Sequence, residues 1–276
     1  MMRLAAVMVV VALVACTGTA PLVVTAWTSP PGAPPIPGRA PGALRVMSYN
    51  VNFGGAGDPE TITAIARAAP DIVLLQETND RWEAALLTAL PQYPHHRFTP
   101  PRTRWRAGGM GVLSRYPITT LEELPSVNGP FFAWRLVFDT PEGPIQVLHV
   151  HLRPAISDGG SWVVGYFSTR DDRERELAWH LARLDPTLPT LLAGDFNEEL
   201  DGHAMRLAAR LGYTDAVAPF EGGKRTWEWP VGPFTLRFQL DHLLHDAHFE
   251  PNAAGVVGAG RSDHKAIWAD LARVTP

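Results

Sequence analysis

The chain has 276 residues, of which 46% are hydrophobic and nine are tryptophans, so it lacks the low hydrophobicity that is typical of disordered proteins. This length suffices for one large hydrophobic core or two small ones. The formal net charge of -4 argues against a protein that binds nucleic acid through its overall charge, and leaves room only for a local basic groove.

The N-terminal residues of the chain predict an export signal. One basic residue, Arg3, precedes a twelve-residue apolar run (4–15), which is short for a membrane span and typical of the core of a secretory signal. The letters LVAC end at Cys16, the only cysteine, and resemble the bacterial lipobox, whose cysteine is lipidated. Residues 1–16 are therefore predicted to be a signal peptide with a lipobox-like end. A plain signal peptide and an uncleaved anchor are the alternatives.

A proline-rich segment follows the signal. Residues 17–42 contain seven prolines and no periodicity of apolar residues, which is typical of a stiff tether. We therefore expect an exported protein, either a membrane-tethered lipoprotein or a periplasmic or extracellular one. No break in composition divides residues 43–276, so we expect one domain there, and we expect a monomer.

Strands and helices alternate at the start of this domain, and several strands then follow one another. The predicted order is strand LRVMSYNV, helix PETITAIARAA, strand DIVLLQE, helix NDRWEAALLTAL, strands GMGVLSR, ITTLEEL, FFAWRLVFDT and GPIQVLHVHL, helix TRDDRERELAWHLARL, strand PTLLAGDFN, helix HAMRLAARLG, and strands FQLDHLLH and KAIWADL. The turn DTPEGP predicts an antiparallel hairpin. Helix and strand units followed by consecutive strands predict an α+β fold with antiparallel sheets.

Polar residues end several of these predicted strands. The segments SYN, LLQE, HVHL and GDFN close four apolar runs, and LDH and SDH flank the last ones. Since such endings suggest strand ends that converge, we expect the polar residues to share one cleft. Their carboxylate and amide oxygens suit Mg²⁺, Mn²⁺ or Ca²⁺ better than zinc, and their histidines exchange protons near neutral pH. Hard oxygen ligands together with histidines are what hydrolysis of a phosphate ester requires.

In this order, the six segments resemble the endonuclease/exonuclease/phosphatase superfamily, which has the DNase I-like fold, over about residues 44–272. The resemblance implies two stacked, mainly antiparallel β-sheets flanked by helices, with the active site at one end of the sandwich. It implies a divalent metal ion, usually Mg²⁺, and hydrolysis of phosphodiester or phosphomonoester bonds. The expected substrate is a nucleic acid, a phospholipid or a small phosphorylated molecule.

The resemblance also implies roles for individual residues. The implied metal-binding residues are Asn50, Glu77 and Asp263. The implied catalytic residues are His151, Asp195, Asn197, Asp241 and His264. Among these, Asp195 and Asn197 would activate water and hold the phosphate. His264 would contact the scissile phosphate with Asp241 behind it, and His151 would lie toward the leaving group.

The sequence leaves alternative interpretations open for Asn52, for two loops and for the function itself. Asn52 is either a turn residue ahead of two glycines or part of the site. The loop PRTRWRAGG (101–109) either meets phosphates or anionic lipid, or is solvated. The connection SDGGSWVVGYFSTR (157–170) is expected to be a loop that shapes access to the site. The alternative function is a surface-tethered protein that binds a phosphorylated ligand without cleaving it.

Further histidines receive structural interpretations. His149 shares a strand face with His151 and is expected to pack against its neighbours rather than to act in the site. The run His242, His245 and His248 is expected to lie on the surface of a strand.

Overall fold

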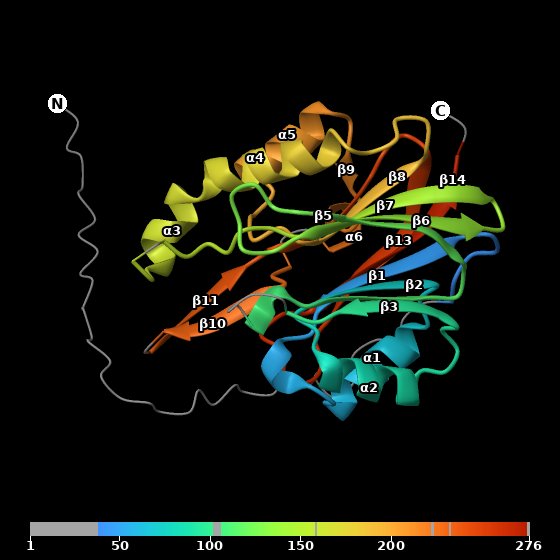
Figure 1. Ribbon diagram of the computed structural model, residues 1–276, viewed down its shortest axis with the longest axis horizontal. Coiled ribbons are helices and arrows are strands. Elements are labelled where there is room, and N and C mark those ends of the chain that lie inside the picture. The colour runs from blue at the N-terminus through green and yellow to red at the C-terminus, as the bar shows by residue number, and fades with distance from the viewer. Residues whose placement is uncertain (1–37, 102–105, 158, 222–223, 232, 275–276) are drawn as a thin grey trace.

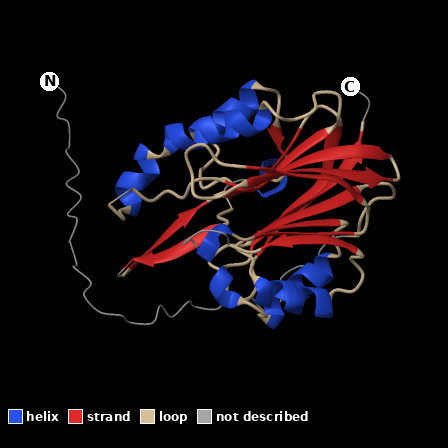
Figure 2. Ribbon diagram, viewed as in Figure 1, coloured by secondary structure: helices blue, strands red, loops and turns tan. Residues whose placement is uncertain are grey.

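Two six-stranded sheets face each other in the computed structural model, and helices cover the outer face of each sheet (Figure 1; Figure 2). The structure describes residues 38–101, 106–157, 159–221, 224–231 and 233–274. The predicted signal peptide and most of the predicted tether, along with residues 102–105 of the arginine-rich loop, lie outside the described residues. Within the described ranges, no helix has both the length and the apolar character that crossing a membrane requires.

The first sheet has the strand order β13-β14-β1-β2-β4-β3, and its one parallel pair is β1–β2. Its strands are Leu44–Asn50 (β1), Ile72–Gln76 (β2), His95–Thr99 (β3), Met110–Ser114 (β4), Phe249–Val257 (β13) and Ala266–Arg273 (β14). The outer face of this sheet is covered by Pro59–Ala68 (α1) and Asp80–Ala89 (α2).

The second sheet has the order β5-β6-β7-β8-β12-β9, again with one parallel pair, β7–β8. Its strands are Ile118–Leu124 (β5), Ala133–Thr140 (β6), Gly143–His151 (β7), Thr190–Asp195 (β8), Thr214–Asp215 (β9) and Asp241–His245 (β12). The helices Arg170–Leu181 (α4) and His203–Arg210 (α5) cover its outer face. The shorter helical elements are Trp162–Ser168 (α3), Ala218–Glu221 (α6), Phe53–Gly55 (η1) and Arg106–Gly108 (η2).

The strands Trp227–Val231 (β10) and Phe234–Phe238 (β11) form a separate hairpin. In Figure 1 this hairpin projects from the sheets as an arm on the side where α3 also lies. The ring of Tyr166 in α3 stacks on Phe238 of β11, with 5.2 Å between ring centroids, and this contact joins the two elements.

Alternation along the strands divides the apolar residues among three layers of packing. Val46 of β1 and Leu191 of β8 point between the sheets, where the largest cluster of buried apolar side chains lies. Their neighbours Met47 and Leu192 point to the outer faces and pack beneath the helices. Because side chains alternate across a strand, both faces of each sheet are buried, which explains why the central strands are almost continuously apolar.

A buried ion pair joins β1 and β14, which are neighbouring strands in the first sheet. Arg45 of β1 places Nε 2.6 Å from Oδ1 and Nη2 2.7 Å from Oδ2 of Asp270 in β14. Nη1 of the same guanidinium donates to the carbonyl of Ala68, 2.9 Å away. Both side chains are almost fully covered, so each charge depends on the other for its stabilisation.

The predicted α+β fold with two mainly antiparallel sheets is confirmed, and so is the hairpin of β6 and β7. The connection that was expected to be a loop, residues 157–170, contains the helix α3 instead. The sequence patterns also gave no sign of β3, β13 or the arm made of β10 and β11.

Candidate active site

The polar residues predicted at strand ends converge at one end of the sandwich. His151 ends β7 and lies beside Asp195, the last residue of β8, which in turn lies beside Asp241 at the start of β12. In the facing sheet, β1 ends at Asn50, whose Nδ2 lies 3.1 Å from Oδ2 of Asp195. The strand register therefore brings together residues that are almost two hundred positions apart in the chain.

His264 lies between two buried carboxylates. Its Nδ1 is 2.9 Å from Oδ2 of Asp241, and its Nε2 is 3.6 Å from Oδ2 of Asp195. Burial alone would lower the pKa of His264, but Asp241 and then Asp195 outweigh it and raise this pKa well above its usual value. The ring is therefore held as an imidazolium, which can donate a proton or stabilise negative charge.

Asp195 is the carboxylate on which both sheets converge. Its Oδ1 accepts a hydrogen bond from the backbone N–H of Asn197 at 2.9 Å, and its Oδ2 accepts one from Asn50. Burial raises the pKa of Asp195 to about 6, against the lowering effect of His264 and with a further contribution from Asp241. A carboxylate with a pKa this close to neutrality can accept a proton from water and release it again.

His151 flanks Asp195 on the other side, in the opposite protonation state. Its Nε2 lies 3.6 Å from Oδ2 of Asp195, and its ring stacks on Phe131 with 4.1 Å between centroids. Burial lowers the pKa of His151 to about 3, and the charge of His264 adds to this effect. One aspartate thus lies between a neutral and a protonated imidazole, a division that suits acid–base chemistry.

A second acidic region surrounds Glu77, directly after β2. Its Oε1 accepts a hydrogen bond from Asn50 Nδ2 at 3.0 Å. Asp263 accepts hydrogen bonds from Asn52 Nδ2 at 2.8 Å and from the indole Nε1 of Trp227 at 2.9 Å. Burial raises the pKa of Glu77 to about 7, and the negative charge of Asp263 raises it further.

These two carboxylates fit a divalent cation. In the part of the chain that the structure describes, neither Glu77 nor Asp263 has a lysine or arginine partner. A cation with a preference for oxygen ligands would relieve their repulsion. Asn50 presents its amide nitrogen to the carboxylates, while its Oδ1 accepts the N–H of Asn52 at 3.1 Å. Asn50 therefore holds the acidic groups in place, and its own role as a metal-binding residue stays a prediction.

Another set of metal-compatible atoms fits a cation less well. Ligand atoms of Asp195, Asp241 and His264 all lie within 4.8 Å of one another. The imidazole in this set is already paired with both carboxylates, and its raised pKa keeps the proton that a metal ion would have to displace. The region of Glu77 and Asp263 is therefore the better candidate for a metal ion.

The backbone at the site is held in an uncommon conformation. Asn52, Glu77 and Asn197 have φ angles of 54°, 61° and 52°, in the left-handed region that few residues other than glycine adopt. Asn52 also accepts the N–H of Gly54 through its Oδ1. The two open interpretations of Asn52 therefore both apply, since it forms the turn and also binds Asp263.

Two further histidines fill structural places. His149 is fully buried; its Nε2 lies 2.7 Å from Gln76 Nε2, in agreement with the packing role predicted for it. The expectation that His242 and His245 lie on a strand surface is wrong, because both are buried, and Nδ1 of His242 lies 2.8 Å from Oδ2 of Asp215. Its Nε2 lies 2.9 Å from the carbonyl oxygen of Glu198, so this ion pair supports the chain just after Asp195.

Sequence patterns missed two aromatic residues of the site. Trp227 lies on the arm β10 and reaches Asp263, and Phe131 lies before β6 and stacks on His151. The only signal for Trp227 was the density of tryptophans in the segment TWEW, which gave no indication of a partner.

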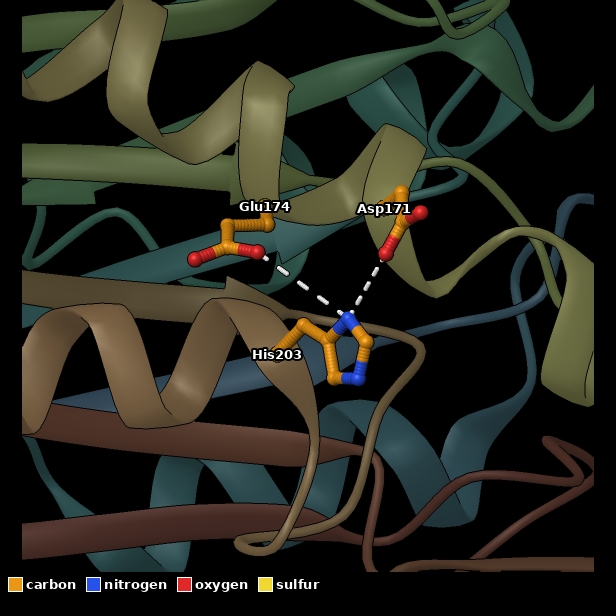
Figure 3. A group of neighbouring side chains, drawn as sticks. All are labelled: Asp171, Glu174 and His203. Atoms are coloured by element: carbon orange, nitrogen blue, oxygen red, sulfur yellow. Dashed lines mark hydrogen bonds and ion pairs between the residues drawn. The ribbon is translucent and has the colours of Figure 1, made fainter.

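A third acidic group lies away from the site, between α4 and α5 (Figure 3). Nδ1 of His203 is 2.8 Å from Asp171 and 3.9 Å from Glu174, and the guanidinium of Arg210 is 2.8 Å from Glu174. The three metal-compatible side chains are exposed or half-exposed, and Glu174 is already paired with Arg210. We interpret this group as an ion-pair network that links the two helices.

Comparison with known proteins gives one family and one fold. The sequence model of the Endonuclease/Exonuclease/phosphatase family matches residues 47–264. A structure described as endonuclease/exonuclease/phosphatase from Beutenbergia cavernae is 22% identical, with a TM-score of 0.66; the match covers 84% of this chain and 72% of that one. No curated protein sequence gives a significant match.

Two further similar structures carry more specific titles. TDP2 of D. rerio, complexed with single-strand DNA product, is 16% identical with a TM-score of 0.63, and the match covers 83% of this chain and 98% of that one. Sphingomyelinase C from Streptomyces griseocarneus is 20% identical with a TM-score of 0.59, covering 83% and 99%. At these identities the similarity establishes the fold.

Proposed function

Because the chain belongs to the Endonuclease/Exonuclease/phosphatase family, we propose that it is a hydrolase of phosphate esters that depends on a divalent metal ion. The observation that carries this proposal is the buried Asp195 between a neutral and a protonated imidazole. The carboxylates of Glu77 and Asp263 next to it, which have no lysine or arginine partner among the described residues, support the dependence on metal.

The roles of the residues follow from these positions. Asn50, Glu77 and Asp263 would hold the ion, Mg²⁺ in the first place and Mn²⁺ or Ca²⁺ as alternatives, and the ion would neutralise charge on the phosphate oxygens. Asp195 accepts the proton of the attacking water. Protonated His264 and the amide of Asn197 stabilise the charge of the transition state.

The remaining residues orient this machinery. Asp241 accepts the Nδ1–H of His264 and fixes the direction in which the ring presents its other nitrogen. His151, held against Phe131, lies toward the leaving group. We further propose that the enzyme acts outside the cytoplasm, attached through Cys16; this part rests on the sequence of residues 1–42 alone.

The test is a hydrolysis assay with the full-length chain. We expect cleavage of bis(p-nitrophenyl) phosphate, of plasmid DNA or of sphingomyelin vesicles in Mg²⁺, its loss in EDTA, and its return when Mg²⁺ is restored. Activity that persists in EDTA would contradict the metal dependence. Binding of Mg²⁺ without cleavage of any of the three would favour the alternative of a non-catalytic binding protein.

The pH dependence of kcat/KM provides a further prediction. The ionised forms of Asp195, with a pKa of about 6, and Glu77, with a pKa of about 7, are the active ones, so the rate should fall as pH decreases through this range. His264 acts when protonated, and because its pKa is raised, it loses this proton only at higher pH. Because a bound cation favours ionised Glu77, raising the Mg²⁺ concentration should move the acid limb to lower pH. An acid limb that does not respond to Mg²⁺ would contradict the assignment of Glu77.

A further inference from the structure

A groove opens beside Glu77, along the turn that follows β1. Its volume is about 640 Å³, and residues of the turn, of the N-terminal end of α2 and of the segment before η2 line it. The groove lies next to the site, because the backbone nitrogen of Phe53 in its wall lies 3.4 Å from Oε2 of Glu77. Asn79, another lining residue, donates its Nδ2–H to the carbonyl of Phe53 at 2.9 Å. A substrate held at Glu77 would therefore extend into this groove.

Positive charge exceeds negative charge among the described side chains at the groove. Arg81 and Arg106 line it, and Arg261 packs beside Gly55 of the same turn. All three side chains are exposed, and none has a carboxylate partner among the residues that the structure describes. Asp80 is the one carboxylate among its lining residues that the structure describes.

Some arginines elsewhere on the surface have carboxylate partners. On α4 and α5, Arg175 pairs with Asp172 and Arg210 pairs with Glu174. The chain as a whole is acidic, with a net charge of -4, whereas two arginines and only one carboxylate are among the described lining residues of the groove. Uncompensated guanidinium groups beside a phosphoesterase site suit a ligand that brings more than one negative charge.

The groove also offers a planar surface. The guanidinium of Arg106 lies over the ring of Phe53, 5.1 Å from its centroid. An arginine on an aromatic ring is a platform on which a nucleic-acid base can stack. The cationic end of a zwitterionic phospholipid would instead meet the positive charges of Arg81 and Arg106.

We propose that this groove binds the portion of a single-stranded nucleic acid next to the scissile phosphate, with a neighbouring phosphate at Arg81 and Arg106 and a base against Phe53. This inference rests on the proposed function, and it names the substrate class of the same site. It uses only described residues, and residues 102–105 carry none of it.

The test measures binding separately from turnover. In an Asp195→Asn background with Mg²⁺, fluorescence anisotropy reports binding of a short labelled oligothymidylate or oligouridylate to the full-length chain. Arg81→Gln/Arg106→Gln should weaken binding at least tenfold. It should also reduce the slope of log affinity against log salt by about 0.7, since both arginines contact the same neighbouring phosphate and each lost phosphate contact on a single strand accounts for about 0.7. The matched control, Arg67→Gln/Arg210→Gln, removes the same charge away from the groove and should change neither quantity.

Kinetics with active protein provide the second readout. Arg81→Gln/Arg106→Gln should lower kcat/KM for the oligonucleotide, relative to kcat/KM for bis(p-nitrophenyl) phosphate, by at least tenfold. Most of this decrease should come from a higher KM for the oligonucleotide. The inference would be overturned if Arg81→Gln/Arg106→Gln changed neither the affinity for the oligonucleotide, nor its salt dependence, nor the ratio of the two kcat/KM values. It would also be overturned if the protein bound and cleaved sphingomyelin vesicles in preference to the oligonucleotide. A different result would contradict the proposed function alone. In that case the protein would not hydrolyse the small ester, although its arginine-dependent binding of the oligonucleotide persisted.

Discussion

Asp195→Asn should lower kcat/KM for a phosphodiester by about 10³-fold while the protein remains folded. Among the described residues of the site, only this carboxylate both contacts Asn50 of β1 and lies beside the imidazoles of His151 and His264. Its amide replacement has the same shape and can still accept the N–H of Asn197, but it cannot accept a proton from water. Steady-state kinetics at saturating Mg²⁺ and a thermal melt followed by circular dichroism measure the two parts of this prediction.

The thermal melt has a definite expected direction. Burial raises the pKa of Asp195 to about 6, which means that folding disfavours the charged carboxylate. Replacing it with a neutral amide should therefore leave the melting temperature unchanged or raise it. Asp201→Asn, an exposed neighbour, is the matched control and should retain full activity. A decrease in rate of less than tenfold for Asp195→Asn would exclude this residue as the base.

Asp270→Ala should destabilise the protein by about 3–5 kcal/mol, because it leaves the guanidinium of Arg45 buried without its partner. The hydrogen bond from Arg45 to the carbonyl of Ala68 and the position of its guanidinium over the Trp268 ring compensate only a part of that charge. Urea unfolding monitored by tryptophan fluorescence measures the change in the free energy of unfolding. The active-site end of the sheet is distant along both strands, so the folded fraction should retain its activity.

The double variant Arg45→Met/Asp270→Leu separates the ion pair from the cost of a single uncompensated charge. Removing both charged groups should cost less than removing Asp270 alone, since the desolvation of Arg45 is then avoided as well. A double variant that is as unstable as the sum of the two single variants would show that the charges do not act as a pair.

Several of the predicted site residues end strongly apolar runs, and the structure brings them together at one end of the sandwich. Asp195 and His151 end strands whose buried alternation is unambiguous, and the register of those strands then sets them side by side. The order of the segments, from SYN to SDH, carried the resemblance to the family. Local pattern and family motif agreed, so the fold class and the location of the candidate site followed together.

The elements that were missed have weak or conflicting local patterns. The strand β13 contains Pro251 next to a register shift and lies at the edge of its sheet, where proline is tolerated. The helix α3 exposes Phe167 and Val164, so its apolar residues do not form a face toward the core. These elements owe their conformation to neighbours that are remote in sequence.

The contacts that sequence patterns did not reveal are long-range side-chain pairs. Trp227 and Asp263 are 36 positions apart, and His242 finds its partner Asp215 27 positions earlier. A buried histidine in the letters LDHLLH is indistinguishable by pattern from one at the surface, because burial depends on which strand lies alongside. The burial of His242 therefore depends on tertiary structure, which the local sequence pattern does not contain.

The left-handed backbone at Glu77 has an evolutionary consequence. A glutamate in this conformation costs about 1–2 kcal/mol relative to glycine, which adopts it freely. Selection for stability alone would thus replace Glu77 with glycine, and only selection for the side chain's charge opposes that drift. A descendant that had lost its chemistry would be expected to accumulate glycine here early, so the residue at this position would serve as a record of whether a lineage still uses its site.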